Sequence, residues 1–113
     1  MLDIFSTRPI EEVGKLQFKN IIKDKSIQVS PHAMDHLSEA QRKVFKEEQL
    51  IQMLEKENPR KIYLQQNGRY APYYRRSGGY RKLIIEVEDR KIIIVSFMDP
   101  LEIPRIKLQN GKN

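Results

Sequence analysis

The side chains of this 113-residue sequence that could do chemistry gather in one stretch, residues 58–85. The stretch contains seven cations, no carboxylate and all five tyrosines of the chain. Lysine and arginine neutralise phosphates, while tyrosine rings offer stacking surfaces for unpaired bases. This stretch, which we call the cationic segment, therefore predicts binding to RNA or another nucleic acid.

Five side chains of the cationic segment are the candidate nucleic-acid contacts. Its arginines and lysine would bind phosphates, and a tyrosine would stack on a base. The alternative is a solvated hairpin whose tyrosines are ordinary strand formers, since tyrosine is enriched in strands. Protein surfaces normally mix charges of both signs, whereas this segment has seven cations and no carboxylate. We therefore favour binding. The candidates are Arg69, Tyr73, Arg75, Arg76 and Lys82.

Arg81 is the cation best suited to catalysis. By strand alternation it shares a face with Leu83 and Ile85, so we expect it at the margin of the core, where a cleft between sheet and helices could open. A guanidinium there could grip a phosphate in bidentate fashion or stabilise charge that develops during its transfer. The alternative is an arginine that only extends along the sheet edge. Its neighbour Tyr80 is a second catalytic candidate.

His32 and His36 are the only histidines, and they lie four residues apart. Two imidazoles do not complete a metal site, and no glutamate stands between them to form the metalloprotease motif, so we expect no metal and no cofactor. His32, in the first turn of an expected helix, is a candidate general acid or base, because histidine titrates near neutral pH. The alternative is a histidine bonded to the backbone or packed on Phe45.

The composition excludes several classes of protein. The net charge of +6 and the isoelectric point of about 9.6 favour a polyanionic partner. The chain has no cysteine and so needs no oxidising compartment, and we expect it to be cytoplasmic. No apolar run reaches the roughly 18 residues that span a bilayer. The sequence has no P-loop, dinucleotide-binding or Ser-His-Asp pattern, which removes the commonest nucleotidase, dehydrogenase and hydrolase classes.

Two periodicities predict the elements that position these residues. A helical spacing of apolar residues comes first, and alternation follows it from Arg60 onward. Helices are expected from Pro9 onward, at 31–43 and at 46–58, and strands at 27–29, 60–66, 69–76, 80–88 and 91–98.

Helices that precede strands favour an α+β fold. We expect an N-terminal helix and a helical hairpin packed on one face of a four-stranded antiparallel sheet, with the other face open. The expected division is a largely helical N-terminal extension (1–26), a core domain (27–104) and a flexible tail (105–113).

Four short motifs lie within residues 27–99: Val29-Ser30-Pro31-His32-Ala33, Phe45-x-Glu47-Glu48, Gly68-Arg69-Tyr70 and the apolar strand at 92–97. They resemble an uncharacterised family of small proteins, related to the RelE/ParE toxin superfamily, that opens with Ser-x-His-Ala-x-x-Arg. His32 matches the histidine of this motif, whereas His36 stands where the motif has arginine.

The resemblance implies a RelE-like sheet and a metal-independent endoribonuclease that an acidic antitoxin holds inactive. Such enzymes position RNA with cations and activate a ribose 2′-hydroxyl with arginine, lysine, tyrosine or histidine. The first 26 residues are not covered, and a helix there could serve self-association into a homodimer.

Three hypotheses for function follow. The leading one is a toxin-like RNA-binding protein, whose catalytic form would be an endoribonuclease that uses His32, Arg81 and Tyr80. The second is a non-catalytic nucleic-acid-binding module. The third is a protein-interaction domain whose basic face docks an acidic partner.

Overall fold

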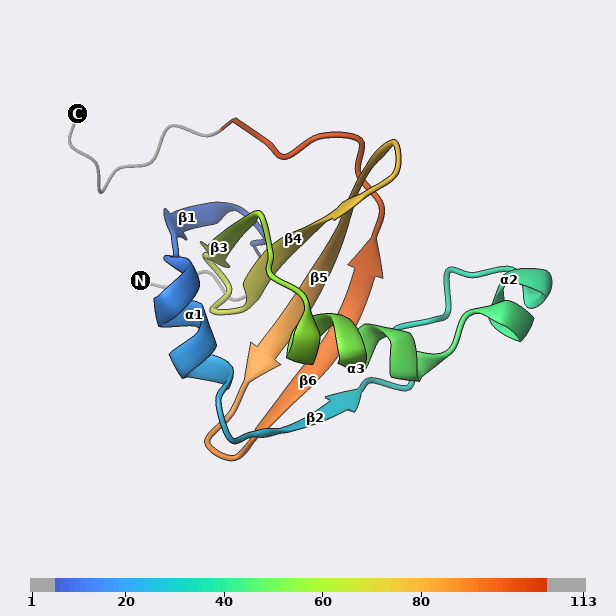
Figure 1. Cartoon of the computed structure of the whole chain (residues 1–113), viewed down its shortest axis with the longest axis horizontal. Helices are drawn as coiled ribbons and strands as arrows, with labels where there is room; N and C mark the ends of the chain where they lie inside the picture. The colour runs from blue at the N-terminus through green and yellow to red at the C-terminus, as the bar shows by residue number, and fades with distance from the viewer. Residues whose placement is uncertain (1–5, 106–113) are drawn as a thin grey trace.

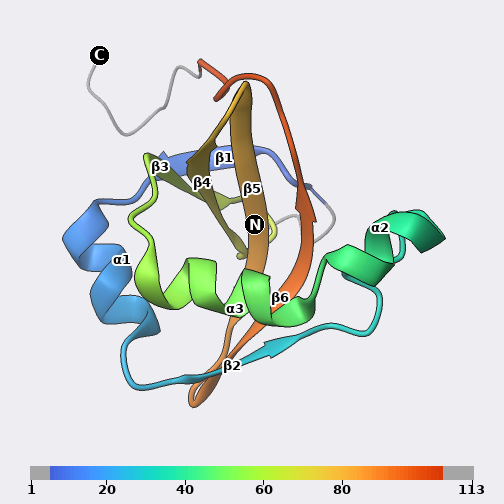
Figure 2. The ribbon, with the colours of Figure 1, turned by 45° about the vertical axis from the view of Figure 1, so that its right-hand side comes forward.

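Residues 6–105, the part of the chain that the computed structural model describes, form one six-stranded sheet and three short helices (Figure 1). In chain order the elements are β1 (Pro9–Glu12), α1 (Lys15–Ile22), β2 (Ser26–Val29), α2 (Glu39–Val44), α3 (Glu47–Lys56), β3 (Lys61–Gln65), β4 (Tyr70–Arg76), β5 (Gly79–Val87) and β6 (Lys91–Met98). The strand order is β1-β3-β4-β5-β6-β2. Helices α1 and α3 lie on the same face of the sheet (Figure 2).

Strands β3 to β6 form an antiparallel meander at the centre of the sheet. Their bounds agree with the four predicted strands, because apolar and polar side chains alternate along them and glycines mark the turns. Gly68 (φ 89°) and Gly78 (φ 79°) adopt the positive φ that glycine tolerates without strain. A bulge between Ile84 and Ile85 shifts the register of β5 against β6.

The predicted fold class, a four-stranded antiparallel sheet with helices packed on one face, is wrong. The sheet has six strands and is mixed, because a short strand is added at each edge. β2 pairs in parallel with the first half of β6, and β1 pairs antiparallel with β3. The sequence predicted β2 as a short strand at 27–29 but not its place in this sheet, and it predicted a helix where β1 lies.

The helix predicted from Pro9 is instead the edge strand β1. Proline suits the first turn of a helix, but it also suits an edge strand, where its missing N–H costs no ladder bond. Pairing with β3 decides between the two, and Val13 N continues it by donating to Ile62 O at 2.8 Å. The helix α1 begins only after Gly14 and buries Phe18.

The predicted helical hairpin is also wrong. Residues 31–36 form turns, and α2 begins after Ser38, whose side chain forms a capping box with Gln41. This cap satisfies two backbone groups, so the helix begins there rather than at Ser30. None of the six residues of α2 is buried, and Val44 at its end is 77% exposed. Only α3 follows its prediction and buries its apolar stripe against the sheet.

Apolar clusters cover both faces of the sheet. Successive residues of a strand point to opposite faces, so Tyr73 and Tyr74 belong to different clusters. The helical-face cluster, beneath α1 and α3, contains Val13, Phe18, Leu50, Met53, Leu54, Ile62, Tyr74, Leu83, Ile85, Ile92, Ile94 and Phe97. The second-face cluster contains Tyr63, Ala71, Tyr73 and Ile84, with Tyr80, Val95 and Ile103 packed against it. The face that was expected to be open is therefore apolar, and Ile103 packs on it.

The predicted division into an extension, a core domain and a tail can be compared with the packing of the described residues. Val13 and Phe18, from the predicted extension, lie in the helical-face cluster. The predicted tail lies, apart from Arg105, outside the described residues, as do residues 1–5. In the described part of the chain, no helix has the length and apolar character needed to cross a membrane.

The burial pattern predicts that α3 matters for stability and that α2 does not. Leu50→Ala removes a fully buried side chain from the helical-face cluster, and we expect it to lower the free energy of unfolding by about 2–5 kcal/mol. Val44→Ala, at an exposed position on α2, should change it by less than about 0.5 kcal/mol. Urea denaturation measures both, and equal losses would show that α2 packs against the core after all.

Candidate functional site

The side chains of the cationic segment divide between the two faces of the sheet. Arg81 lies over Phe45 and Phe97 on the helical face, with its guanidinium carbon 4.8 and 5.2 Å from the ring centroids. Lys82, the next residue, points the other way, and its Nζ lies 5.5 Å from the centroid of Tyr73. Arg75 and Arg76 on β4 are separated in the same manner. The segment therefore presents no single continuous face.

Four of these cations are neutralised by carboxylates from elsewhere in the chain. Each pair joins a residue of the segment to a different element, and the N–O distances run from 2.8 to 3.6 Å. The pairs are Lys61 with Glu12, Arg69 with Glu86, Arg76 with Glu57 and Arg81 with Asp99. Among the described residues, only Arg60, Arg75 and Lys82 of the segment have no ion pair.

Three of the five tyrosines of the segment are buried, whereas Tyr70 and Tyr80 are half-buried. Tyr63, Tyr73 and Tyr74 are 4%, 2% and 0% exposed, so their rings cannot stack on a base in this conformation. Burial, together with the nearby Tyr63, raises the pKa of Tyr73 to about 12. Burial also lowers the pKa of the Lys82 ammonium. Arg75, Arg76 and Tyr80 line one open cavity of about 560 Å³ at the tip of the β4–β5 hairpin, whereas Arg69, Tyr73 and Lys82 do not line it. The five predicted contacts are therefore only partly brought together, and RNA binding stays a prediction.

The three predicted catalytic residues do not meet. His32 is exposed on the turns before α2, and its Nδ1 lies 2.9 Å from Oδ2 of Asp35. Tyr80 packs on the second-face cluster, whereas Arg81 lies on the helical face. Catalysis by these three side chains together has no support in this geometry.

Arg81 does lie where the sequence predicted, at the margin of the helical face beside a cleft. The cleft has a volume of about 370 Å³ and lies between the ends of β5 and β6 and the segment around α2. Nε and Nη2 of Arg81 donate to the two carboxylate oxygens of Asp99 at 2.8 and 3.0 Å. His36, rather than His32, lines this cleft, with its ring edge-on to Phe97 at 4.6 Å between centroids.

Asp99 is a partner of Arg81 that sequence reasoning missed. A hairpin extended from the predicted turn at residues 89–90 places Met98 opposite Arg81. An extra residue in β6, Val95, between the partners of Ile84 and Ile85, moves the register by one residue, so that Met98 pairs with Lys82 and Asp99 follows opposite Arg81. The sequence contained no residue pattern that would have predicted this bulge, and so the pairing of Arg81 with Asp99 was not foreseen.

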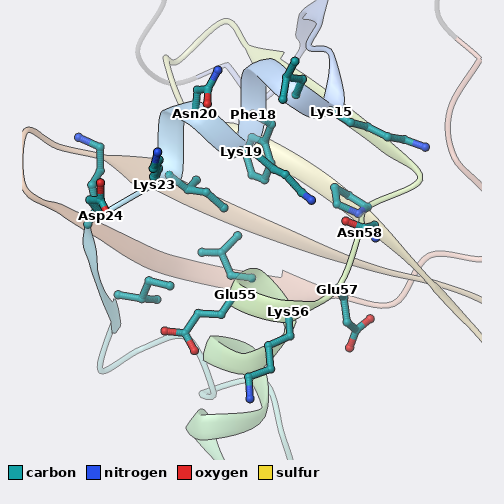
Figure 3. Close-up of a pocket in the computed structure, with 16 residues that line it drawn as sticks. Lys15, Phe18, Lys19, Asn20, Lys23, Asp24, Glu55, Lys56, Glu57 and Asn58 are labelled. Atoms are coloured by element: carbon teal, nitrogen blue, oxygen red, sulfur yellow. The ribbon is translucent and has the colours of Figure 1, made fainter.

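A second and larger cavity, of about 540 Å³, lies between α1 and the end of α3 (Figure 3). We call it the interhelical groove. Its apolar lining includes Phe18 and Leu54, which are buried, and Ile22 and Ile27, which are half-buried. Leu16, on the same wall as Phe18, is 74% exposed.

The α1 wall of the interhelical groove is cationic. Lys15 and Lys19 lie one turn apart on α1, and Lys23 is the C-cap that follows Ile22, so the three lysines form a row along this wall of the groove. All three are exposed, and within residues 6–105 none of them forms an ion pair. Figure 3 shows Lys19 extending from α1 toward Asn58, at the end of α3. The row is a concentration of positive charge that nothing in the described chain neutralises.

The carboxylates of Asp24, Glu55 and Glu57 also line the groove, but none of them forms an ion pair with these lysines. Glu57 is bound by Arg76 through two contacts, 2.9 and 3.0 Å, and its carboxylate points away from α1 in Figure 3. Lys56 also points away from α1. Lys25, at the far end of the groove, is held by the carbonyls of Glu88 and Asp89.

Comparisons with protein-family models, with curated proteins and with solved structures found no match to this chain. The resemblance to the RelE/ParE superfamily therefore stays a prediction, and the function has to be argued from the groove and the cleft themselves.

The Arg81–Asp99 pair predicts a pH-dependent contribution to stability. The hydrogen bonds from Arg81 lower the pKa of Asp99 below its ordinary value, outweighing the opposite effect of burial. A depressed carboxyl pKa stabilises the fold above its unfolded value of about 3.8, and the contribution is lost as pH falls through the folded pKa.

Asp99→Asn should therefore lower the thermal midpoint at neutral pH, and its difference from wild type should shrink toward zero in acid. Glu102→Asn, at an exposed carboxylate three residues away, is the control and should leave the midpoint unchanged. A deficit of Asp99→Asn that persists unchanged below the folded pKa would contradict the assignment.

Proposed function

We propose that this protein is a protein-interaction domain that binds an acidic, partly apolar segment of a partner protein in the interhelical groove. This proposal is a form of the third hypothesis, in which the protein docks an acidic partner. It differs in placing the contact at the groove between helices rather than on the basic strands. The absence of cysteine from the chain agrees with a cytoplasmic setting for this interaction.

One observation carries the proposal: an unneutralised lysine row runs beside an exposed leucine, above an apolar floor. Leu16 buries little in the described chain, and its exposure costs free energy that a partner could recover. Charges at the rim of such a site speed association and select partners of opposite sign. An amphipathic helix with carboxylates along one flank supplies both kinds of contact, and grooves between helices commonly bind such segments.

A polynucleotide fits this groove less well. Phosphates could pair with Lys15, Lys19 and Lys23, but a phosphate backbone offers nothing to cover Leu16. Phe18, the aromatic residue that lines the groove, is 1% exposed and gives no stacking surface. The toxin-like endoribonuclease remains an untested prediction.

Binding of defined probes tests the proposal. The first probe is a fluorescent helical peptide with leucines on one face and glutamates on its flanks, and the second is the same peptide with lysines in place of the glutamates. The third probe is a single-stranded RNA. We expect the acidic peptide to bind most tightly by fluorescence anisotropy, with an affinity that falls as salt is added.

Variants then locate the site. Lys19→Glu with Lys23→Glu should lower the affinity for the acidic peptide by about tenfold, and Leu16→Ala should do so by a similar factor. Lys43→Glu with Lys46→Glu is the matched control, because it makes the same change in net charge at exposed positions outside the groove. Equal loss in the two double variants, or binding of RNA in preference to the acidic peptide, would overturn the proposal.

A further inference from the structure

After β6 ends at Met98, the chain stays close to the sheet. Residues 99–104, which we call the strap, turn back past the β4–β5 hairpin toward the opposite edge of the sheet (Figures 1 and 2). Pro100 and Pro104 lie at its two ends, and proline favours an extended conformation in the residue before it. The strap bends at residues 101–102 and pairs with no strand of the sheet.

Specific contacts hold the strap on the second face. Its first carboxylate, Asp99, is bound by Arg81. Tyr80 N donates to Pro100 O at 3.0 Å, and Tyr63 Oη donates to Pro104 O at 3.3 Å. Between these points Ile103 packs on the second-face cluster.

Glycine at position 79 is what allows the strap to lie so close. A Cβ at Gly79 would lie 2.8 Å from Pro100 O and 3.2 Å from Leu101 Cα, both of them backbone atoms that cannot rotate away. Any larger residue at this position would push the strap outward. The absence of a side chain at Gly79 thus sets how closely the strap approaches β5, and Gly79 is not itself a member of the second-face cluster.

The strap is weakly held compared with the strands beneath it. It has no ladder partner, and Leu101 at its middle is 78% exposed. Segments with few buried apolar contacts open locally at a free energy well below that of global unfolding. The side chains beneath it, by contrast, include Tyr63 and Tyr73, which are among the most buried of the chain.

We propose that the strap is a detachable cover that opens while the sheet stays folded and thereby controls access to the second face. Opening uncovers the rings of Tyr63 and Tyr73 beside the ammonium of Lys82, which already lies over Tyr73. No strap residue lines the interhelical groove, so this movement leaves the groove unchanged. Release of the strap and binding in the groove are therefore separable events.

Chemical modification of tyrosine tests the proposal, because the cluster carries its own reporters. Nitration with tetranitromethane, read by peptide mass spectrometry, gives a rate for each tyrosine. Tyr63 and Tyr73 report on the strap, while Tyr74, fully buried on the helical face, reports on global unfolding. In the wild-type protein we expect Tyr63 and Tyr73 to react faster than Tyr74.

Gly79→Ala should raise the nitration rates of Tyr63 and Tyr73 by about tenfold and leave that of Tyr74 unchanged, because only the strap is displaced. Gly14→Ala is the matched control, since a Cβ there meets no atom within 4 Å. Ile103→Ser, which removes the apolar anchor without a steric clash, should act in the same direction should Gly79→Ala fail to fold. Rates of Tyr63, Tyr73 and Tyr74 that rise together in these variants would show that the strap opens only when the domain unfolds, and would overturn the proposal.

Discussion

Burial on both faces of the β4–β5 hairpin is the constraint from which the rest of the structure follows. Tyr73 and Tyr74 are adjacent in sequence and both almost completely buried, one in the second-face cluster and the other in the helical-face cluster. A strand that is covered on both sides has room for a charge only near its ends or beside a partner. The hairpin therefore carries its arginines toward its tip, and Lys82, further in, loses part of its hydration.

This constraint explains why charge that is concentrated in the sequence is dispersed in the structure. The cationic segment lacks carboxylates of its own, so four of its half-buried cations find partners on β1, at the end of α3, on β5 and after β6. These pairs fasten distant segments to the central meander. Charge that would have attracted a polyanion is instead used largely within the fold.

The chain retains two features that its own packing does not satisfy. Along α1, a lysine row and an exposed leucine line a groove in which no carboxylate of residues 6–105 forms an ion pair with those lysines. Across the second face, a strap without ladder hydrogen bonds covers a well-packed tyrosine cluster. The first feature invites a partner because charge and apolar surface remain unpaired there. The second permits movement because little free energy holds the cover in place.

The sequence by itself determined the elements whose pattern is long enough to be periodic. Alternation located β3 to β6 to within two residues, the helical period located α3, and alternation also placed Arg81 on the core face beside a cleft. These predictions succeeded because side-chain direction is set locally by the backbone.

Only the tertiary structure decided the rest. Pro9 could begin a helix or an edge strand, and pairing with β3 chose the strand. A bulge chose Asp99 rather than Met98 to face Arg81, and coverage of both sheet faces buried tyrosines that a solvated hairpin would have left open. Each outcome depends on a partner far away in the chain, and a local pattern of residue types does not specify such a partner.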